Sequence, residues 1–251
     1  MRVLDKERWR LIDLEYDNPC MNLAVEEAIP TLLGRGFVQS TVRFWRNVNM
    51  VVLGRFQDIV YEVNLNACKR YKTRVIRRFT GGGAVYQDLG NLNYAISLSR
   101  GHPLVSNDIS TTVETLSQGV IEGLNILGIK VEYKPSKGIF ICGKKISGSA
   151  SAVKQGFFFN HGTLLISSNL DILSEVLTAT SKRRKSDDML TMVTNLEDEL
   201  GKEISIMDVK KALKKGFEKT FQIRLIKGKL CKEEVILAHR LLKEKYVVER
   251  L

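Results

Sequence analysis

The sequence predicts a mixed α+β domain, in which helices pack on a central mixed and largely antiparallel β-sheet. Strand-like alternation recurs between residues 41 and 166, and helical periodicity stands between and after these stretches. Hydrophobic residues make up 44% of the 251 residues, which is enough for a substantial core. The four prolines and the lack of a Ser/Gly/Pro-rich tract indicate one domain over 1–251. Its sheet-based core would reach about residue 195, and a C-terminal helical extension would span about 196–251.

The first predicted element is a short helix over 21–29. Asn22 is its candidate cap, and Glu26 and Glu27 are expected on its solvent side. Pro30 should stop or kink this helix, because proline has no N–H to donate to residue 26. Strands at 41–46, 50–54 and 73–77 and a short helix at 63–71 are predicted next.

The later elements include two longer helices. Apolar residues recur every three or four positions from 108 to 127, which predicts an amphipathic helix closed by Gly128. Ser205 with Asp208 resembles a capping box at the start of another helix, and the dense charge over 181–188 is typical of a loop. The other predictions are a strand at 130–134, a hairpin of 138–142 and 144–152 turning at Cys142-Gly143, a strand at 157–166, and helices at 170–178 and 232–246.

Composition argues against several classes of protein. Charges punctuate the first 20 positions and no run of about 18 apolar residues exists, so neither a signal peptide nor a membrane span is expected. The four cysteines are far apart, which argues against zinc or a disulfide framework and predicts a cytoplasmic protein. The net charge of +11 favours an anionic ligand or an acidic partner; a solvated basic surface accounts for much of it, and nucleic acid is not specified.

Residues 77–99 form the most informative segment of the chain. Arg77 and Arg78 offer planar guanidinium groups that suit phosphate or carboxylate. Gly81–Gly83 have no Cβ, so a ligand can approach their backbone N–H groups closely. The alternation over 92–99 predicts a strand after this loop, whereas a Rossmann or P-loop fingerprint needs a helix there. A glycine-rich hairpin with two exposed arginines is the simpler alternative.

A second candidate segment covers 143–150. In a strand, Lys144 and Lys145 point to opposite faces. Small residues from Gly148 onward would leave a groove beside Lys145, while Lys144 is expected to be exposed. His161 either hydrogen-bonds a substrate or is a satisfied structural histidine, and the sequence leaves both open.

These segments supply cations and backbone donors, but the chain contains no convincing nucleophile. There is no Ser-His-Asp order with nucleophile-elbow spacing, and no pair of carboxylates stands out. Such a site would neutralise a polyanion while an oxygen of the substrate attacks it, as in phosphoryl or nucleotidyl transfer.

Three segments, Arg77–Asn93, Gly143–Ala150 and His161–Leu165, closely resemble lipoate–protein ligases of the A family. Met21–Ala28 resembles the first helix of that family, and Val193–Leu196 resembles the segment after its adenylate-binding loop. The resemblance runs through nearly the whole chain and implies a catalytic domain like that of biotin and lipoate ligases. It also implies activation of lipoate with ATP and Mg²⁺ to lipoyl-AMP, and transfer of the lipoyl group to a lysine of an acceptor lipoyl domain.

The resemblance further implies roles for single residues. Lys145 matches the central catalytic lysine, which would neutralise the α-phosphate and hold the substrate carboxylate, and the charged loop around 182–185 matches the segment that folds over the adenylate. The implied adenylate-binding residues are Arg78, Gly82, Gly83, Ala84, Val85, Tyr86, Asn91, Asn93 and Lys145, and the implied lipoate-binding residues are Arg78, Lys145, His161 and Gly83. Further candidates are Arg77, Gln87, Arg55 and Lys182, with Val52, Gly54 and Val85 as candidates for an apolar tunnel; no metal ligand is assigned.

The chain departs from the family pattern at several positions. Gln87 stands where the family often has histidine, and Asn160 stands where histidine is common before His161. Many members continue into a small accessory domain after the helix predicted at 232–246, so the resemblance implies a separate accessory polypeptide here. The expected acceptors are lipoyl domains of 2-oxoacid dehydrogenase complexes or the glycine cleavage H protein.

Two alternative functions stay open. An octanoyl transferase on the same scaffold would take its acyl group from a carrier protein without ATP, and this chemistry needs a cysteine nucleophile. Its relatives place that cysteine upstream of the lysine, where this chain has Lys134, Pro135 and Ser136, and Cys142 stands beside the hairpin turn. The other alternative is a non-catalytic protein that binds an acyl-adenylate or nucleic acid. We expect the ligase.

Overall fold

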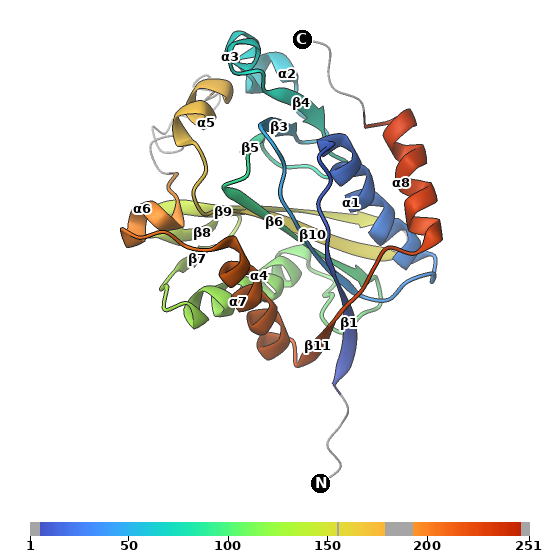
Figure 1. Ribbon diagram of the computed structural model, residues 1–251. Helices are drawn as coiled ribbons and strands as arrows, with labels where there is room; N and C mark the ends of the chain where they lie inside the picture. Colours follow the sequence, from blue (N-terminus) through green and yellow to red (C-terminus); the bar gives the residue numbers. More distant parts are fainter. Residues whose placement is uncertain (1–5, 155, 179–192, 247–251) are drawn as a thin grey trace.

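A computed structural model describes residues 6–154, 156–178 and 193–246 (Figure 1). Within them, eight strands form one sheet in the order β11-β1-β2-β6-β10-β9-β8-β7, and three strands form a smaller sheet in the order β4-β3-β5. The strands of the large sheet are β1 (Glu7–Asp13), β2 (Thr41–Trp45), β6 (Asn91–Ser99), β7 (Glu132–Lys134), β8 (Gly138–Ile141), β9 (Lys144–Lys154), β10 (Phe157–Leu165) and β11 (Ile223–Lys227). The small sheet contains β3 (Met50–Leu53), β4 (Arg74–Arg77) and β5 (Val85–Gln87).

Helices cover both faces of the large sheet. They are α1 (Pro19–Gly34), α2 (Ile59–Glu62), α3 (Leu65–Tyr71), α4 (Ile109–Ile126), α5 (Leu170–Val176), α6 (Leu196–Leu200), α7 (Ile206–Thr220) and α8 (Lys232–Glu244). In the large sheet only the pairings of β1 with β2 and with β11 are parallel, so the predicted mixed and largely antiparallel sheet is confirmed.

The alternation predicted over 92–99 separates two chemically different faces of β6. Leu92, Tyr94, Ile96 and Leu98 belong to the main core, together with apolar residues of α4 and α7. These two helices approach closely, because a methyl group on Gly216 would meet the carbonyl oxygen of Gly119 at 2.4 Å. The opposite face of β6, which carries Asn91 and Asn93, is free of this core and is available for a polar site.

Helix α1 differs from its prediction at both ends. Its N-cap is Asn18, whose side chain accepts from the N–H of Cys20, and the helix continues through Pro30 to Gly34. The prediction of an Asn22 cap was therefore wrong, and the helix does not stop at Pro30. Asn22 is buried and hydrogen-bonds Asn47 and the backbone of Tyr16. Helix α1 packs against α8 and against β6 and β10, and this packing compensates for the one backbone bond that proline removes.

The expected solvent exposure of Glu26 and Glu27 was also wrong, since both side chains are buried. The Glu27 carboxylate accepts hydrogen bonds from Lys154 Nζ (3.1 Å), Lys245 Nζ (2.6 Å) and Tyr246 Oη (2.5 Å). A buried carboxylate needs such partners because unpaired burial of a charge is costly. Glu27 thus joins α1 to β9 and to the residues that follow α8.

This cluster predicts a loss of stability in acid. Burial raises the pKa of Glu27, but the bonds from Lys245 and Tyr246 and the charge of Lys154 outweigh it, and the net pKa lies below the usual 4.5. A carboxyl whose pKa is lowered by folding stabilises the native state above its unfolded pKa, and this contribution disappears as the pH falls below about 4.5. We expect the free energy of unfolding, measured with urea from pH 6 to pH 3, to fall more steeply for the wild type than for Glu27→Gln. Parallel curves would contradict the assignment.

The C-terminal part contains a strand that the sequence analysis did not predict. Strand β11 pairs in parallel with β1, which was also not predicted, and it forms one edge of the large sheet between α7 and α8 (Figure 1). Ser205 caps α7 as predicted, but its side chain makes no capping hydrogen bond. The hairpin turn at Cys142-Gly143 is confirmed, with φ of 48° and 79°, as two-residue hairpin turns require.

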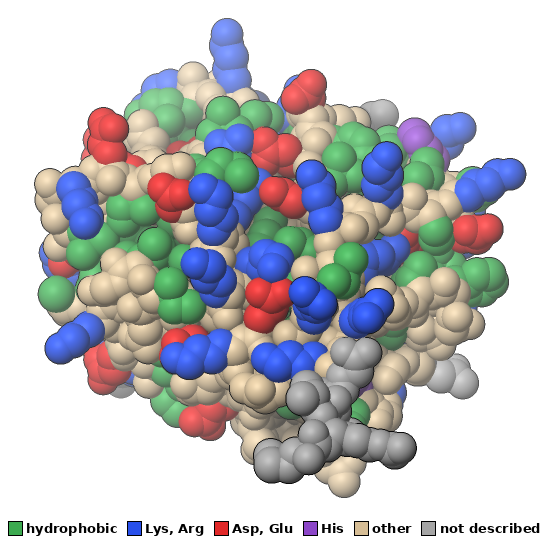
Figure 2. Space-filling view, turned by 60° about the horizontal axis from the view of Figure 1, so that its bottom comes forward, with side chains coloured by type: hydrophobic (Ala, Val, Ile, Leu, Met, Phe, Trp, Pro, Cys, Tyr) green, Lys and Arg blue, Asp and Glu red, His purple; other side chains and the backbone are tan. Residues whose placement is uncertain are grey.

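Lysine and arginine side chains are spread over the face in Figure 2, with acidic side chains between them. On α7, Lys210 pairs with Asp13, Lys214 with Glu218 and Lys219 with Glu122. The lysines of these pairs range from largely buried (Lys210) to exposed (Lys219), so the interpretation of a solvated basic surface holds for part of this helix. In the part of the chain that the structure describes, no helix combines the length and apolar character needed to cross a bilayer.

Candidate active site

The glycine-rich loop connects β4 to β5, and β3 lies between these two strands. The glycines therefore stand between strands as predicted, but in a crossover loop rather than in a hairpin. Gly82 has φ of +87°, which favours glycine. A methyl group on Gly54 would meet the Gly82 carbonyl oxygen at 2.0 Å, so the loop can pack against the end of β3 only because residue 54 is glycine. The loop fills this space, and Gly54 is therefore not open as a tunnel wall.

Arg78 fastens the glycine-rich loop to β3. Its guanidinium donates to the carbonyls of Val52 (3.0 Å), Gly81 (2.6 Å) and Gly83 (2.9 Å), and its Nε donates to Thr80 Oγ1 (2.9 Å). Burial lowers the pKa of Arg78 to about 10, against a smaller opposing effect of the Glu26 charge, so the group is protonated at neutral pH. In this structure most donors of Arg78 serve its own loop, which indicates that it shapes the loop that would meet a ligand.

The two other candidate arginines lie beside this loop. Arg77 Nη1 donates to the carbonyls of Gly54 (3.2 Å) and Gln57 (2.6 Å), and so it holds the turn that follows β3. Arg55 is exposed, its N–H donates to the Thr80 carbonyl (2.8 Å), and its guanidinium lies 5.3 Å from the centroid of the Phe56 ring.

Lys145 lies near the start of β9, and its end reaches the face of the sheet below the glycine-rich loop. A bulge between β8 and β9 places two steps along β9, from Lys145 to Ser147, opposite the single step from Phe140 to Ile139 on β8. A methyl group on Gly148 would meet both Cε and Nζ of Lys145 at 3.2 Å, so the ammonium group lies over this glycine. The small residue at 148 therefore leaves room for the Lys145 side chain itself, and a groove for a ligand stays a prediction. Lys144 is exposed as predicted and pairs with Glu199 at 2.9 Å.

The same face joins Lys145 to the glycine-rich loop. Ala150 follows Gly148 by two residues and shares its face, and a methyl group on Gly82 would lie 3.4 Å from Ala150 Cβ. The segment after residue 192 is also adjacent, because Thr194 N–H donates to the Lys145 carbonyl (3.0 Å) and Val193 forms a bridge with Lys145. Two segments about 65 residues apart in the sequence thus form one site.

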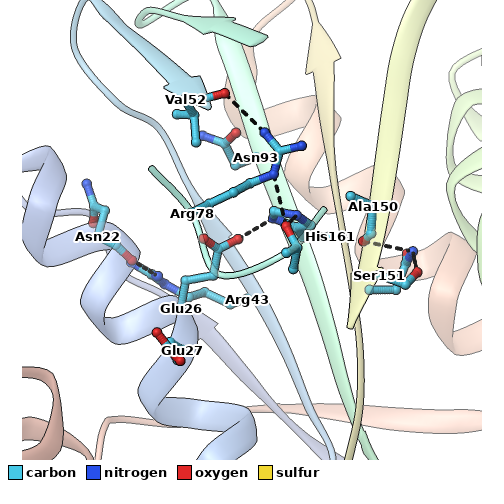
Figure 3. A network of polar contacts seen from close by, with 12 residues as sticks. Asn22, Glu26, Glu27, Arg43, Val52, Arg78, Asn93, Ala150, Ser151 and His161 are labelled. Carbon is cyan, nitrogen blue, oxygen red and sulfur yellow. Dashed lines mark hydrogen bonds and ion pairs between the residues drawn. The ribbon is translucent and has the colours of Figure 1, made fainter. Parts of the chain in front are cut away.

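His161 lies beside Ala150 on the neighbouring strand and connects α1 to the loop (Figure 3). Its Nδ1 contacts the Glu26 carboxylate, and its Nε2 lies 2.8 Å from Thr80 Oγ1. Both ring nitrogens are therefore engaged within the protein, as in the structural interpretation of this histidine. The other oxygen of Glu26 is buried and has no hydrogen-bond partner.

Polar side chains continue the site along β6. Asn91 Nδ2 donates to Asn93 Oδ1 (3.1 Å), while Asn91 Oδ1 and Asn93 Nδ2 are buried without partners. The two atoms are on the face of β6 that lacks the main core, which Figure 3 shows for Asn93 beside Val52 and Arg78. Buried polar atoms of this kind normally have partners, so these two are candidates for contact with a bound ligand.

The remaining candidates follow the loop into β5. Ala84 and Val85 are half-buried where the loop ends, and the Tyr86 side chain packs in a core shared with α3 and α5, which leaves only its backbone as a candidate for the site. Val52 belongs to a core formed with α1. Gln87 accepts a hydrogen bond from Asn47 (2.6 Å). Lys182 and the charged loop around 182–185 lie outside the described residues.

Two residues of the site were not predicted. Glu26 was expected on the solvent side of its helix, and Thr80 was not among the candidates. A signal for Glu26 was present, because the segment 19–33 is apolar on nearly every side of the helix. A helix of this kind is buried all round, and a carboxylate on it must find a partner.

The fold and the site together define a domain with a candidate site for an anionic ligand between a glycine-rich loop and a strand lysine. Backbone N–H groups and the charges of Lys145 and Arg78 are suited to stabilising a phosphate while bonds to it change. The model of the lipoyl protein ligase A/B catalytic domain matches residues 18–218, and the chain belongs to this family.

Relatives with two different activities are similar over almost the whole chain. An octanoyltransferase LipM of Brevibacillus brevis is 29% identical, covering 97% of this chain and 98% of its own length. The lipoate-protein ligase A subunit 1 of Thermoplasma acidophilum is 32% identical, covering 96% and 94%. The chain is therefore an enzyme of the lipoate and octanoate ligase–transferase family, and sequence similarity alone does not distinguish the two activities.

Solved structures of lipoate-protein ligases have the same fold. A T. acidophilum lipoate protein ligase with bound lipoic acid superimposes with a TM-score of 0.82 at 33% identity, covering 95% of this chain and 96% of that chain. A lipoate-protein ligase A bound with ATP gives 0.81 at 32% identity and covers 96% and 95%. A bipartite T. acidophilum ligase, described with its E2 lipoyl domain, gives 0.81 at 33% identity and covers 95% and 93%. The predicted ligase-like fold is thereby confirmed.

Proposed function

We propose that this chain is the catalytic component of an ATP-dependent lipoate–protein ligase. In the first step an oxygen of the lipoate carboxylate bonds to the α-phosphorus of ATP, the bond to the β-phosphate breaks, and pyrophosphate leaves. In the second step the ε-amine of an acceptor lysine bonds to the acyl carbon. The mixed anhydride breaks, AMP leaves, and the amine loses a proton to solvent.

The observation that carries the proposal is the position of the four cysteines, all of which lie in described residues. Cys20 and Cys68 are buried in cores, and burial raises the pKa of Cys68 to about 11. Cys231 caps α8. Cys142 lies in the exposed hairpin turn beside the Glu199 carboxylate, on the side to which Lys144 points. No thiol shares the face that carries the Lys145 ammonium, and direct attack on ATP requires none.

Each residue of the site has a role in this reaction. Lys145 neutralises the charge that develops at the α-phosphate and holds the substrate carboxylate. The backbone of Gly82–Tyr86 lines the adenylate, and Arg78 keeps this backbone in place through the three carbonyls that it binds. Asn93 and Asn91 offer their unpartnered amide atoms to the same ligand. The ring of His161, held by Glu26 and Thr80, forms a wall of the lipoate site.

The Mg²⁺ of this proposal would enter these steps bound to the phosphates of ATP. No group of three or more potential metal ligands exists among the described residues, so a preformed cage is lacking there. Mg²⁺ commonly keeps its waters and binds through substrate phosphates, and it would arrive with ATP.

The partners follow from the chemistry and from the relatives. The bipartite T. acidophilum ligase and its E2 lipoyl domain support a lipoyl domain of a 2-oxoacid dehydrogenase complex as acceptor and a second polypeptide as accessory. We also propose the glycine cleavage H protein as an acceptor and the cytoplasm as the location of this protein.

Octanoyl transfer is the second candidate, because the LipM relatives match the chain from end to end. One assay separates the two functions. We expect lipoylation of an apo lipoyl domain that requires ATP, with or without an added accessory chain, and that persists in the double variant Cys142→Ser/Cys231→Ser. Transfer from an octanoyl carrier protein without ATP, lost on substitution of Cys142, would establish the transferase instead.

A further inference from the structure

The three most exposed large apolar side chains of the described residues lie in one short segment beside the glycine-rich loop. Phe56 is 83% exposed, Val60 67% and Tyr61 64%. The next value, 62%, belongs to Phe37, which follows α1 elsewhere in the chain. Isolated exposed apolar residues are ordinary, but a cluster of large ones marks an interaction surface.

This segment is firmly held. The Gly54 N–H donates to the Gln57 side chain (2.9 Å), Arg77 bonds the Gln57 carbonyl, and the Arg55 N–H donates to the Thr80 carbonyl. At its other end, Val63 is buried and pairs with Leu177. Polar and backbone contacts therefore fix the segment, and they leave its three apolar side chains in solvent.

The position of Phe56 relates this surface to the reaction. A methyl group on Gly81 would lie 3.8 Å from the Phe56 ring, so the ring stands at the rim of the glycine-rich loop. On the function proposed above, an acceptor lysine must reach an acyl group bound at this loop. Because a lysine side chain has only four methylene groups, the acceptor surface that bears this lysine must contact the rim of the glycine-rich loop.

We propose that Phe56, Val60 and Tyr61 form the docking surface for the acceptor domain. The fitting partner has an apolar side chain beside its modifiable lysine, because the rim presents three apolar side chains, and it has polar residues of both charges around it, because Arg55, Asp58 and Glu62 border this surface. A second copy of this chain seated here would cover the rim and exclude the acceptor. The inference rests on the proposed ligase function.

The test compares Phe56→Ser, Tyr61→Ser and the double variant with the wild type and with Phe37→Ser as the matched control. We expect the KM for an apo lipoyl domain, and the Kd of that domain without ATP, to rise about tenfold or more for the double variant. ATP–pyrophosphate exchange with lipoate should stay within twofold. Release of the acyl group to hydroxylamine, which needs no docking, should also stay within twofold.

Three results would overturn the inference: an unchanged Kd and KM for the acceptor, an equal loss of the hydroxylamine reaction, or a wild-type dimer that the double variant dissociates. The second would assign Phe56 to the nucleotide site, and the third would assign the surface to a second copy. Absence of wild-type adenylate formation would refute the ligase function, and the Kd measurement would still decide the docking surface.

Discussion

Replacing Lys145 by alanine is expected to reduce lipoyl-AMP formation by about a thousandfold or more, while the fold is retained. The Lys145 ammonium lies over Gly148, on the face that reaches Gly82 through Ala150. Removing a positioned charge from a developing oxyanion costs two to three orders of magnitude in comparable sites, and here the same group also holds the attacking carboxylate. ATP–pyrophosphate exchange with lipoate measures the step directly.

Lys144→Ala is the matched control for this substitution. Its side chain belongs to the same strand but is exposed and pairs with Glu199. An exposed ion pair of this kind contributes little to stability, so exchange and thermal stability should hardly change. Equal exchange rates for Lys145→Ala and the wild type would refute the role of Lys145. A large loss of exchange in Lys144→Ala would show that substitutions disturb strand β9 itself rather than removing one charge.

Among glycine-to-alanine substitutions in the site, Gly54→Ala should be the most damaging. Its Cβ would stand 2.0 Å from the Gly82 carbonyl oxygen, so either β3 or the glycine-rich loop must move by more than 1 Å. Overpacking of this kind costs about 1–3 kcal/mol of folding free energy, and a displacement of 1 Å near the reacting groups costs about 100-fold in rate. Urea unfolding and pyrophosphate exchange measure the two effects.

Alanine variants of two neighbouring glycines distinguish an effect of backbone strain from an effect of ligand contact. At Gly81 a methyl group meets nothing closer than the Phe56 ring at 3.8 Å, and at Gly83 it meets no protein atom within 4 Å. Both alanine variants should therefore keep wild-type stability. If the loop backbone lines the adenylate as proposed, Gly83→Ala raises the KM for ATP while Gly81→Ala does not. Wild-type activity in Gly54→Ala would show that the loop position does not matter for the reaction.

Local patterns predicted those parts of the site that depend on local geometry. Lys144 and Lys145 point to opposite faces because strand periodicity requires it, and the small residues from Gly148 onward leave room for the lysine that the structure places there. The alternation over 92–99 likewise predicted which face of β6 is apolar. The loop at Gly81–Gly83 was recognisable because glycine at φ of +87° and close backbone approach both have a direct signature in sequence.

Long-range contacts decided the rest. Glu26 and Glu27 look like solvent-facing residues of a short helix until α8, β10 and the glycine-rich loop surround them with His161, Lys245 and Tyr246. The Arg78 guanidinium can bind both its own loop and β3 because β3 lies between β4 and β5. Strands β1 and β11 pair with each other from opposite ends of the chain.

By itself the sequence determined the class of fold, the family resemblance and the two candidate anion-binding segments, because side-chain periodicity and glycine conformation act over a few residues. Only the tertiary structure decided which charges are buried, that Arg78 shapes the loop, and that the exposed Cys142 lies beside the Glu199 carboxylate. The physical reason is that burial and hydrogen-bond partners are properties of segments brought together from distant positions.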